Sequence, residues 1–308
     1  MAKYKVVLNP ISGRGAGEKA IPTLRDELTQ SGMDFDLQLT ERPLHAVELA
    51  SQAVREGYEY VVAVGGDGTA NEVLNGLVLA HKAGAGSAVM GVIGVGRGND
   101  FAYAMGVPSG LQAGCQVLRE GTRRTVDVGC VRGGLFPDGR YFGNGVGIGF
   151  DAVVGFEALK MKRLSGFISY IVAAMKTIFL YYKAPTVLIE CEQRRLETPA
   201  LMVSIMNGRR MGGGFMMAPE SENNDGRFDV CVVEEVSKPT IFALITKFMQ
   251  GTQASHPAVQ FLRTKQISVS ALKGTLPAHA DGETLCTEGD RLTLEIYPGQ
   301  LEIITQTR

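Results

Sequence analysis

Hydrophobic positions in the first 130 residues follow two alternating patterns. Short runs that are apolar throughout alternate with longer stretches in which apolar residues recur at helical spacing. This rhythm is typical of βαβ units, and strands without a polar face are expected where helices cover both faces of a parallel sheet. The predicted strands are Tyr4–Leu8, Phe35–Leu39, Tyr60–Val64, Val89–Ile93 and Val126–Val131, and the predicted helices are Gly17–Gln30, Ala46–Glu56, Thr69–His81 and Leu111–Arg119.

The pattern changes after Asp127 to short strands separated by turn residues, with polar and apolar positions alternating clearly in RLTLEIY. We therefore expect an α/β N-terminal domain with a parallel sheet over residues 1–130 and a mostly antiparallel β-sandwich over 131–308. The last strand could return to the first domain. The predicted strands are Val187–Cys191, Ala200–Met206, Phe228–Glu234, Gln266–Ala271, Arg291–Ile296 and Leu301–Thr305, with helices near Glu157–Tyr182 and Pro239–Gln250.

Composition excludes several classes of protein. The 308 residues carry a net charge of −1, so no chain-wide basic field favours nucleic acid as a partner. The five cysteines stand far apart without a CxxC pair, which argues against a zinc ribbon or a disulfide framework. A strand begins at once in MAKYKVVLNP and no uncharged apolar run is long enough to span a bilayer, so we expect a soluble cytoplasmic protein.

Three glycine-rich loops each follow an apolar strand and precede a helix: Asn9–Gly17, Gly65–Thr69 and Gly94–Asp100. At that edge of a parallel sheet, helix N-termini present free N–H groups, and glycine lets phosphate oxygens approach the backbone. A polyphosphate ligand is the natural inference. The alternative is that the glycines only close tight turns. Neither the GxGxxG fingerprint nor the GxxxxGK[ST] loop occurs.

The motifs NPISG, VAVGGDGTANEVLNG, GVGRGNDFA and HADGETL, in this order, resemble the diacylglycerol kinase catalytic family, specifically the soluble bacterial lipid kinases related to sphingosine and ceramide kinases. The resemblance covers essentially the entire chain and implies an NAD kinase/diacylglycerol kinase-like fold. GGDGT alone is weaker, because NAD kinases and phosphofructokinase relatives carry similar loops.

The resemblance implies that ATP phosphates are held near the GGDGT loop and that Asp67 also recruits the catalytic Mg²⁺. Asn9 and Pro10 match the family's opening motif, and Thr40 matches a nucleotide contact, although it could instead cap the next helix. Where many relatives have threonine, this chain has Arg97, either a phosphate contact or a solvated loop residue. The implied nucleotide site comprises Asn9, Pro10, Thr40, Gly65, Gly66, Asp67, Gly68, Thr69, Asn71, Glu72, Arg97, Asn99 and Asp100.

The DGE motif is the best candidate for acid–base work. If Ala278–Glu283 is extended, Asp281 and Glu283 face the same side, and adjacent carboxylates make one of them a better base. We favour Glu283 as the base, with Asp281 as its partner or as a contact to a magnesium-bound water. The alternative is a hairpin turn, which D-G followed by a charge often forms.

The resemblance implies two further metal-related positions. Asp127 matches an aspartate that joins the metal and water network, although alone it is only an acidic residue in a strand. APESENNDGRFDV resembles a loop that holds a structural Mg²⁺, with the Asp225 carboxylate and the carbonyls of Glu222 and Arg227 as ligands. The alternative is an Asx-type turn.

Lys160–Lys183 combines lysines with an apolar stripe, a pattern that suits the surface of an anionic membrane. The stripe comprises Leu164, Phe167, Ile168, Ile171, Val172, Met175, Ile178, Phe179 and Tyr182. The alternative is core or a subunit interface, as in a homodimer. Asn207–Pro219 could rim a lipid cleft, or its methionines could fill the core. No two histidines have zinc-ligand spacing, and we expect His279 to be a strand residue with a satisfied hydrogen bond.

These observations predict a cytoplasmic kinase, peripheral at the membrane surface, that uses ATP and Mg²⁺ to phosphorylate a lipid hydroxyl, with diacylglycerol giving phosphatidic acid as the leading substrate. Other lipids (sphingosine-like or phosphatidylglycerol), a soluble substrate such as NAD, and a catalytically silent binding protein are the alternatives. The sequence leaves the lipid, the oligomeric state and any regulator open.

Overall fold

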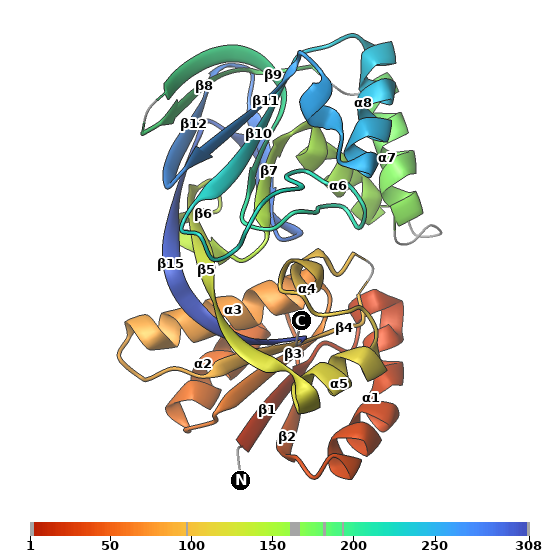
Figure 1. Cartoon of the computed structure of the whole chain (residues 1–308), viewed down its shortest axis with the longest axis vertical. Helices are drawn as coiled ribbons and strands as arrows, with labels where there is room; N and C mark the ends of the chain where they lie inside the picture. Colours follow the sequence, from red (N-terminus) through yellow and green to blue (C-terminus); the bar gives the residue numbers. More distant parts are fainter. Residues whose placement is uncertain (1–2, 97, 161–166, 181–182, 193, 307–308) are drawn as a thin grey trace. The chain divides into compact units, whose positions relative to one another are not determined.

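The computed structural model describes residues 3–96, 98–160, 167–180, 183–192 and 194–306. The chain divides into two compact units. Unit 1 is the chain up to Val128 together with the segment from Gly299 onward, and unit 2 is Gly129–Pro298. Two strands, β5 (Thr122–Gly133) and β15 (Arg291–Thr305), run from one unit into the other (Figure 1).

Unit 1 is built on a parallel sheet in the order β15-β4-β3-β1-β2. Every residue of β3 and β4 is buried, as expected for strands covered on both faces. Figure 1 shows α2 and α3 on one side of this sheet and α1 and α5 on the other. The bounds are β1 Lys3–Leu8, α1 Ser12–Gln30, β2 Asp34–Leu39, α2 His45–Arg55, β3 Tyr60–Gly65, α3 Asp67–Lys82, β4 Val89–Gly94, α4 Asp100–Ala104 and α5 Leu111–Glu120.

Unit 2 is a sandwich of two antiparallel layers. β9 first pairs with β8 in one layer and then with β7 and β10 in the other. The remaining order is β8-β12-β15 on one side and β7-β13-β14 on the other. The bounds are β6 Phe136–Phe142, β7 Gly145–Gly149, β8 Thr186–Cys191, β9 Arg194–Met206, β10 Phe228–Glu234, β11 Val259–Thr264, β12 Gln266–Lys273, β13 Leu276–Ala280 and β14 Glu283–Gly289.

Two apolar cores stabilise unit 2. The first lies between the layers and includes the fully buried side chains of Phe142, Phe228 and Ile148. The second lies between the outer face of the β7-β9-β10 layer and three helices that cover this face (Figure 1). These helices are α6 (Phe150–Lys160), α7 (Phe167–Leu180) and α8 (Lys238–Gln250). The predicted fold class, an α/β unit with a parallel sheet followed by a β-sandwich, is confirmed.

Some expected elements were wrong in detail. In the described part of residues 157–182, where we expected a helix, the structure has α6, which begins earlier at Phe150, and α7. The two strands expected at the end of the chain are one, β15. β7 was missed because its sequence, GVGIG, alternates glycine with apolar residues and resembles a loop.

Candidate active site

Four loops of unit 1 leave the carboxyl ends of neighbouring parallel strands. Asn9 follows β1, Thr40 follows β2, Gly66 follows β3 and Val95 follows β4. Because these strands are parallel and adjacent in the order β4-β3-β1-β2, the loops share one edge of the sheet. The N–H of Val95 donates to the carbonyl of Gly65 over 2.9 Å, which joins two of the loops. The predicted nucleotide residues are therefore gathered at one edge.

Two glycines of these loops are required because neighbouring atoms of the chain leave no room for a Cβ atom. A Cβ on Gly96 would come within 2.5 Å of the Gly66 Cα, and a Cβ on Gly65 would come within 2.4 Å of the Thr69 hydroxyl oxygen. Such distances are shorter than van der Waals contact allows. The tight-turn alternative therefore accounts for Gly65 and Gly96 on its own.

Gly66 is different, because a Cβ there would meet nothing closer than 3.4 Å. Its backbone is extended, with φ −99 and ψ −168, so a larger residue would cause no backbone strain. Packing within the chain thus leaves this glycine unexplained. Gly66 is the residue before the first turn of α3, and the N-terminus of a helix is where an anion would be bound.

Asp67 lies in the first turn of α3 and accepts the N–H of Phe101 on Oδ1 over 2.8 Å. It thereby caps α4, whose own N-cap residue, Asn99, makes no side-chain cap bond. A Cβ on Gly98 would lie 3.0 Å from Asp67 Oδ2 and 3.4 Å from Asp100 Oδ2. Two carboxylates therefore border the space that the missing side chain of Gly98 leaves open.

This donor set fits Mg²⁺, which usually takes one or two carboxylates and completes its octahedron with water and phosphate oxygens. No cluster of three or more His, Cys, Asp or Glu side chains that could hold a metal occurs within the described ranges. A cation here would therefore be bound by Asp67 and Asp100 and would depend on its ligand for the rest of its coordination.

Glu72 and Asn71 are occupied by contacts within the protein. Glu72 accepts the N–H of Leu44 on Oε1 over 3.0 Å and that of Ala46 on Oε2 over 3.1 Å, which caps the start of α2. Asn71 is fully buried, and its Oδ1 accepts from Asn75 over 3.1 Å. Nucleotide contacts at these two residues stay predictions, and their bonding argues against them.

The remaining predicted nucleotide residues of unit 1 lie in or beside the loops. Asn9 donates to the Thr69 hydroxyl over 3.2 Å, tying β1 to α3, and Pro10 follows it. Asn99, at φ 52, accepts the Gly96 N–H on Oδ1 over 3.0 Å and so fixes its own loop. Arg97 lies outside the described residues. Gly68 belongs to the first turn of α3.

Asp127 is buried in β5 and accepts the N–H of Gly299 over 2.8 Å. That bond holds β5 to β15 at the point where both strands enter unit 1. The structure therefore gives Asp127 a role in the fold, and its place in a metal and water network stays a prediction.

The extended geometry expected for the DGE motif of unit 2 was wrong. Asp281 and Gly282 have φ of 45 and 86 and form the two-residue turn between β13 and β14, with Ala280 paired to Glu283. This is the primed hairpin turn that Asp-Gly favours. The two carboxylates therefore do not lie side by side on one strand.

Asp281 is almost completely buried, and its carboxylate accepts three backbone N–H groups. Oδ2 accepts from Gly143 over 2.8 Å, and Oδ1 accepts from Asn144 over 3.0 Å and from Gly145 over 2.9 Å. Asp281 thus holds the hairpin against the loop before β7. Glu283 begins β14 and is only partly buried, which leaves it as the better placed of the two for proton transfer.

A sequence model of the diacylglycerol kinase catalytic domain matches residues 3–131, and a model described as the YegS C-terminal NAD kinase beta sandwich-like domain matches residues 144–305. The first part of the chain thus belongs to the diacylglycerol kinase catalytic domain family, and the second, more than half of the chain, belongs to the YegS C-terminal domain family. That membership confirms the resemblance of its motifs and supports a lipid kinase as the kind of enzyme.

Similar proteins span nearly the same length. A diacylglycerol kinase from Staphylococcus saprophyticus is 28% identical over 282 residues, covering 91% of this chain and 88% of the relative. One from Staphylococcus aureus is 29% identical, covering 91% and 86%. A crystal structure of a diacylglycerol kinase from Bacillus anthracis superposes with a TM-score of 0.73 at 19% identity, covering 99% of this chain and 97% of that one. A second structure from that organism gives 0.79 at 21% with the same coverage. These two share the fold.

The loop in which the family resemblance implied a structural Mg²⁺ forms an Asx turn here. Asp225 accepts the N–H of Arg227 on Oδ1 over 3.0 Å, and its Oδ2 forms an ion pair with Arg263. Both oxygens of the carboxylate are therefore engaged, and a cation would have to displace the arginine. The metal ligands Glu222, Asp225 and Arg227 stay a prediction that this bonding disfavours.

The segment Asn207–Pro219, which could have rimmed a lipid cleft, instead contributes methionines to the core. Met211 and Met217 are buried in the core beneath α6, α7 and α8. The segment is anchored by Asn207, whose N–H donates to the Asn144 carbonyl over 2.8 Å and whose side chain donates to the Gly143 carbonyl over 2.8 Å. The polar residues, not the methionines, connect it to the DGE hairpin.

Helix α7 has two apolar faces. Ala173, Ala174 and Ile178 are buried in the core, whereas the side chains of Ile168, Val172 and Met175 are 61%, 39% and 38% exposed. No helix within the described ranges is both long enough and apolar enough to cross a bilayer. Of the predicted stripe, Leu164, Tyr182 and the side chains of Phe167 and Phe179 lie outside what the structure describes.

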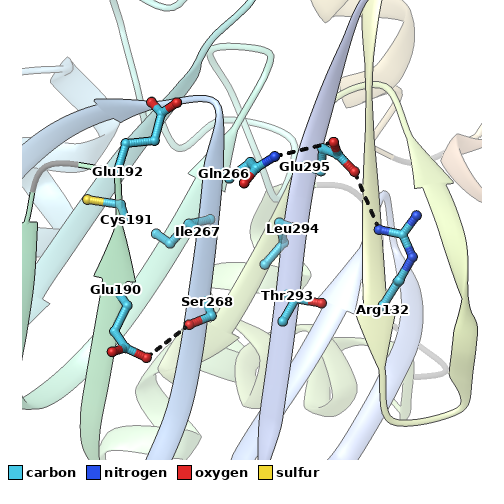
Figure 2. A pocket seen from close by; sticks show the side chains of 10 residues that line it. All are labelled: Arg132, Glu190, Cys191, Glu192, Gln266, Ile267, Ser268, Thr293, Leu294 and Glu295. Carbon is cyan, nitrogen blue, oxygen red and sulfur yellow. Dashed lines mark hydrogen bonds and ion pairs between the residues drawn. The ribbon is translucent and has the colours of Figure 1, made fainter.

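Unit 2 also has a hollow of about 430 Å³ over the β8-β12-β15 layer. Figure 2 shows charged and polar side chains around it, with Ser268 bonded to Glu190 and with Gln266 and Arg132 both directed at Glu295. None of the predicted site residues lines it. We therefore assign it no part in phosphoryl transfer.

Sequence reasoning missed a buried polar cluster next to the DGE hairpin. Asp151, Ser204 and His279 are all buried, and Asp151 accepts from the Ser204 hydroxyl over 2.9 Å. His279 is a strand residue as expected, but the expected hydrogen bond is absent within the described residues, because its Nδ1 is buried without a partner. The alternation of glycines in GVGIG was the only sequence signal for this cluster.

Proposed function

We propose that this chain transfers the γ-phosphoryl group of ATP to a lipid hydroxyl, with diacylglycerol as the acceptor and phosphatidic acid as the product. The observation that carries this proposal is the shared sheet edge of unit 1, where a Cβ on Gly66 would meet nothing closer than 3.4 Å and where Asp67 and Asp100 border the space at Gly98. Family membership supports the lipid as the acceptor.

In unit 1, the N–H groups at the start of α3 would bind phosphate oxygens, because they have no partner within a helix and carry partial positive charge. Mg²⁺ held by Asp67 and Asp100 would neutralise charge on the transferring group. Capping of α4 by Asp67 fixes that carboxylate in place, so that little reorganisation is needed.

In unit 2, Glu283 would accept the proton of the attacking hydroxyl. Glu283 directly follows the two-residue turn of the hairpin. The first residue of that turn, Asp281, is fixed by hydrogen bonds from three backbone N–H groups. A general base must be held at hydrogen-bond distance from the proton that it takes, and a rigid strand end meets that need better than a loose loop.

A panel of acceptors tests the proposal. The protein is incubated with ATP and Mg²⁺ and with diacylglycerol, sphingosine, phosphatidylglycerol or NAD, and the products are identified by mass. We expect phosphatidic acid. Transfer to NAD alone would overturn the lipid assignment, and transfer to another lipid would correct the acceptor. No turnover with any acceptor would favour the catalytically silent alternative.

Matched variants separate the roles in this assay. Asp67→Asn removes the charge that binds Mg²⁺, and Glu283→Gln removes the base; each should lower kcat by about 100-fold or more. Asp34→Asn, an exposed carboxylate at the start of β2, is the control and should leave kcat unchanged. Equal activity in all three variants would contradict the assignment.

We also propose that the exposed face of α7 rests on an anionic membrane. Ile168, Val172 and Met175 recur at helical spacing on the outer face and are among the exposed large apolar residues of the described chain. Lys160 and Lys176 both pair with the single carboxylate of Glu157, which leaves a net positive charge beside this face. An apolar stripe bordered by cations matches the headgroup region of anionic lipid. Such binding would bring the enzyme to the surface where a lipid acceptor is found.

A further inference from the structure

The two faces of β7 differ sharply. Val146 and Ile148 point into the core between the layers of unit 2. On the opposite face stands Gly147, where a Cβ would come within 2.4 Å of Asp151 Oδ2 and 2.7 Å of His279 Nε2. The absence of a side chain at Gly147 therefore creates the space in which the carboxyl and the imidazole face one another.

The two groups come from elements on either side of this space. Asp151 lies in the first turn of α6, where it accepts the Ser204 hydroxyl and the N–H of Ala152, each over 2.9 Å. His279 lies on β13, which pairs with β7 at Gly147 and with β14 at Thr284. Its Nδ1 is buried and has no hydrogen-bond partner within the described residues.

Burial sets the charge of both groups. It raises the pKa of Asp151 to about 7, against the lowering effect of its hydrogen bonds to Ser204 and Ala152. It lowers the pKa of His279 to about 4. Among the described residues, the thiol of Cys231 on β10 also lies close enough to Asp151 to be affected by its charge. Burial, and then Asp151, raises the pKa of this thiol, so it stays neutral. Around pH 6, all three groups are uncharged in the folded protein.

We propose that Asp151 and His279 form a buried pair across Gly147 that positions the hairpin carrying Glu283. The hairpin is held at two points: Asp281 in its turn binds the loop before β7, and His279 on β13 faces the same space beside Gly147 as Asp151 of α6. Glu283 is paired with Ala280, the residue after His279. A charge placed on the buried pair would disturb the strand on which the proposed base depends. The assignment of Glu283 rests on the proposed function.

Unfolding gives a test that is independent of catalysis. In the unfolded chain near pH 6, the aspartate is ionised and the histidine takes up a proton, so folding in effect moves one proton from imidazole to carboxyl. Folded and unfolded states then bind the same number of protons between pH 4 and 6.5, and this pair gives the unfolding equilibrium no pH dependence in that window.

Single variants expose the two opposing contributions. In Asp151→Asn only the lowered pKa of His279 remains. The unfolded chain then binds a proton that the folded chain does not, so the free energy of unfolding decreases as pH falls from 6.5 to 4. In His279→Gln only the raised pKa of Asp151 remains. The unfolded chain then loses a proton that the folded chain keeps, so the free energy of unfolding decreases as pH rises from 4 to 7. Each variant should change its unfolding constant by about tenfold per pH unit relative to the parent. The double variant should again show the parent's pH dependence.

Urea unfolding of the full chain at pH 4.5, 5.5, 6.5 and 7.5 measures these slopes. If the unfolding constants of the single variants depend on pH in the same way as that of the parent, the proposed pair is wrong. The positioning role is read from the pH profile of kcat: the parent should lose activity above pH 7 as Asp151 ionises, whereas Asp151→Asn should not, with the KM for ATP unchanged. An identical decline in both would overturn the positioning role. If no acceptor supports turnover, the proposed function fails while the unfolding slopes still decide the pair.

Discussion

At the scale of single residues, the two carboxylates of the DGE motif, Asp281 and Glu283, differ in burial and in hydrogen bonding. Asp281 is buried and its carboxylate accepts three backbone N–H groups, whereas Glu283 begins a strand and is only partly buried. A carboxylate bonded in this way holds a loop in place. The carboxylate of Glu283, two residues later, is the one that we propose for proton transfer.

Substitution separates these two roles. Asp281→Asn presents an amide group to N–H donors and leaves some of them unsatisfied, so we expect a loss of about 3 kcal/mol in the free energy of unfolding. Glu283→Gln should change stability by less than about 0.5 kcal/mol while lowering kcat by about 100-fold or more. Urea unfolding beside the phosphatidic acid assay measures both. An Asp281→Asn protein as stable as the parent would show that these bonds contribute little.

Gly96 and Gly66 form a second pair whose roles can be separated. Gly96→Ala pushes a methyl group against the Gly66 backbone, so we expect a loss of about 1–3 kcal/mol in stability. Gly66→Ala meets nothing closer than 3.4 Å and should unfold like the parent, but with the KM for ATP raised about tenfold or more, since the methyl covers the backbone proposed to bind phosphate. Normal ATP kinetics in Gly66→Ala would place the nucleotide elsewhere.

At the scale of elements, the outer face of α7 is the feature with a testable consequence. Ile168→Ser with Val172→Ser removes apolar area from this face without touching the core residues Ala173 and Ile178. We expect binding to vesicles of phosphatidylglycerol and phosphatidylcholine to weaken by about tenfold, measured by co-sedimentation. Leu135→Ser, which alters another exposed apolar side chain of unit 2, is the control.

Two other outcomes would redirect this proposal. Unchanged vesicle binding in the α7 variant would show that the face does not meet the membrane. A parent that sediments as a dimer and a variant that sediments as a monomer would identify the face as a subunit interface instead. Both experiments use the full chain at the same salt concentration, because electrostatic attraction to anionic lipid is screened by salt.

At the scale of the whole molecule, unit 1 depends on the far end of the chain. Ile303 of β15 is fully buried and pairs with Met90 of β4, so the sheet of unit 1 is completed by the segment after Gly299. Without it, the apolar strand β4 would be a sheet edge with unpaired backbone groups.

Ile303→Ala should therefore cost about 2–5 kcal/mol, because it leaves a cavity in a packed core. The loss should appear as faster hydrogen exchange in β4 and β3, although they lie more than 200 residues earlier in the sequence. Glu302→Ala, on the exposed face of the same strand, should leave exchange unchanged. Faster exchange confined to unit 2 would contradict this dependence.

The sequence by itself determined the two-part fold, most strands of unit 1 and the set of glycine loops, because apolar periodicity and glycine spacing are local properties. It also determined the family, since its motifs are local and ordered. The residues proposed for Mg²⁺ were only partly predictable: Asp67 was named, but its pairing with Asp100 around Gly98 requires two loops to meet in space.

Only the tertiary structure decided which carboxylates are occupied by the fold. The bonds of Glu72 to α2, of Asp281 to the loop before β7 and of Asp225 to Arg263 join residues far apart in sequence. The pairing of Asp151 with His279 likewise exists only because β7 brings Gly147 between them. A motif states which chemical groups are present, but hydrogen bonding and burial, which arise from packing, decide which of those groups stay available for chemistry.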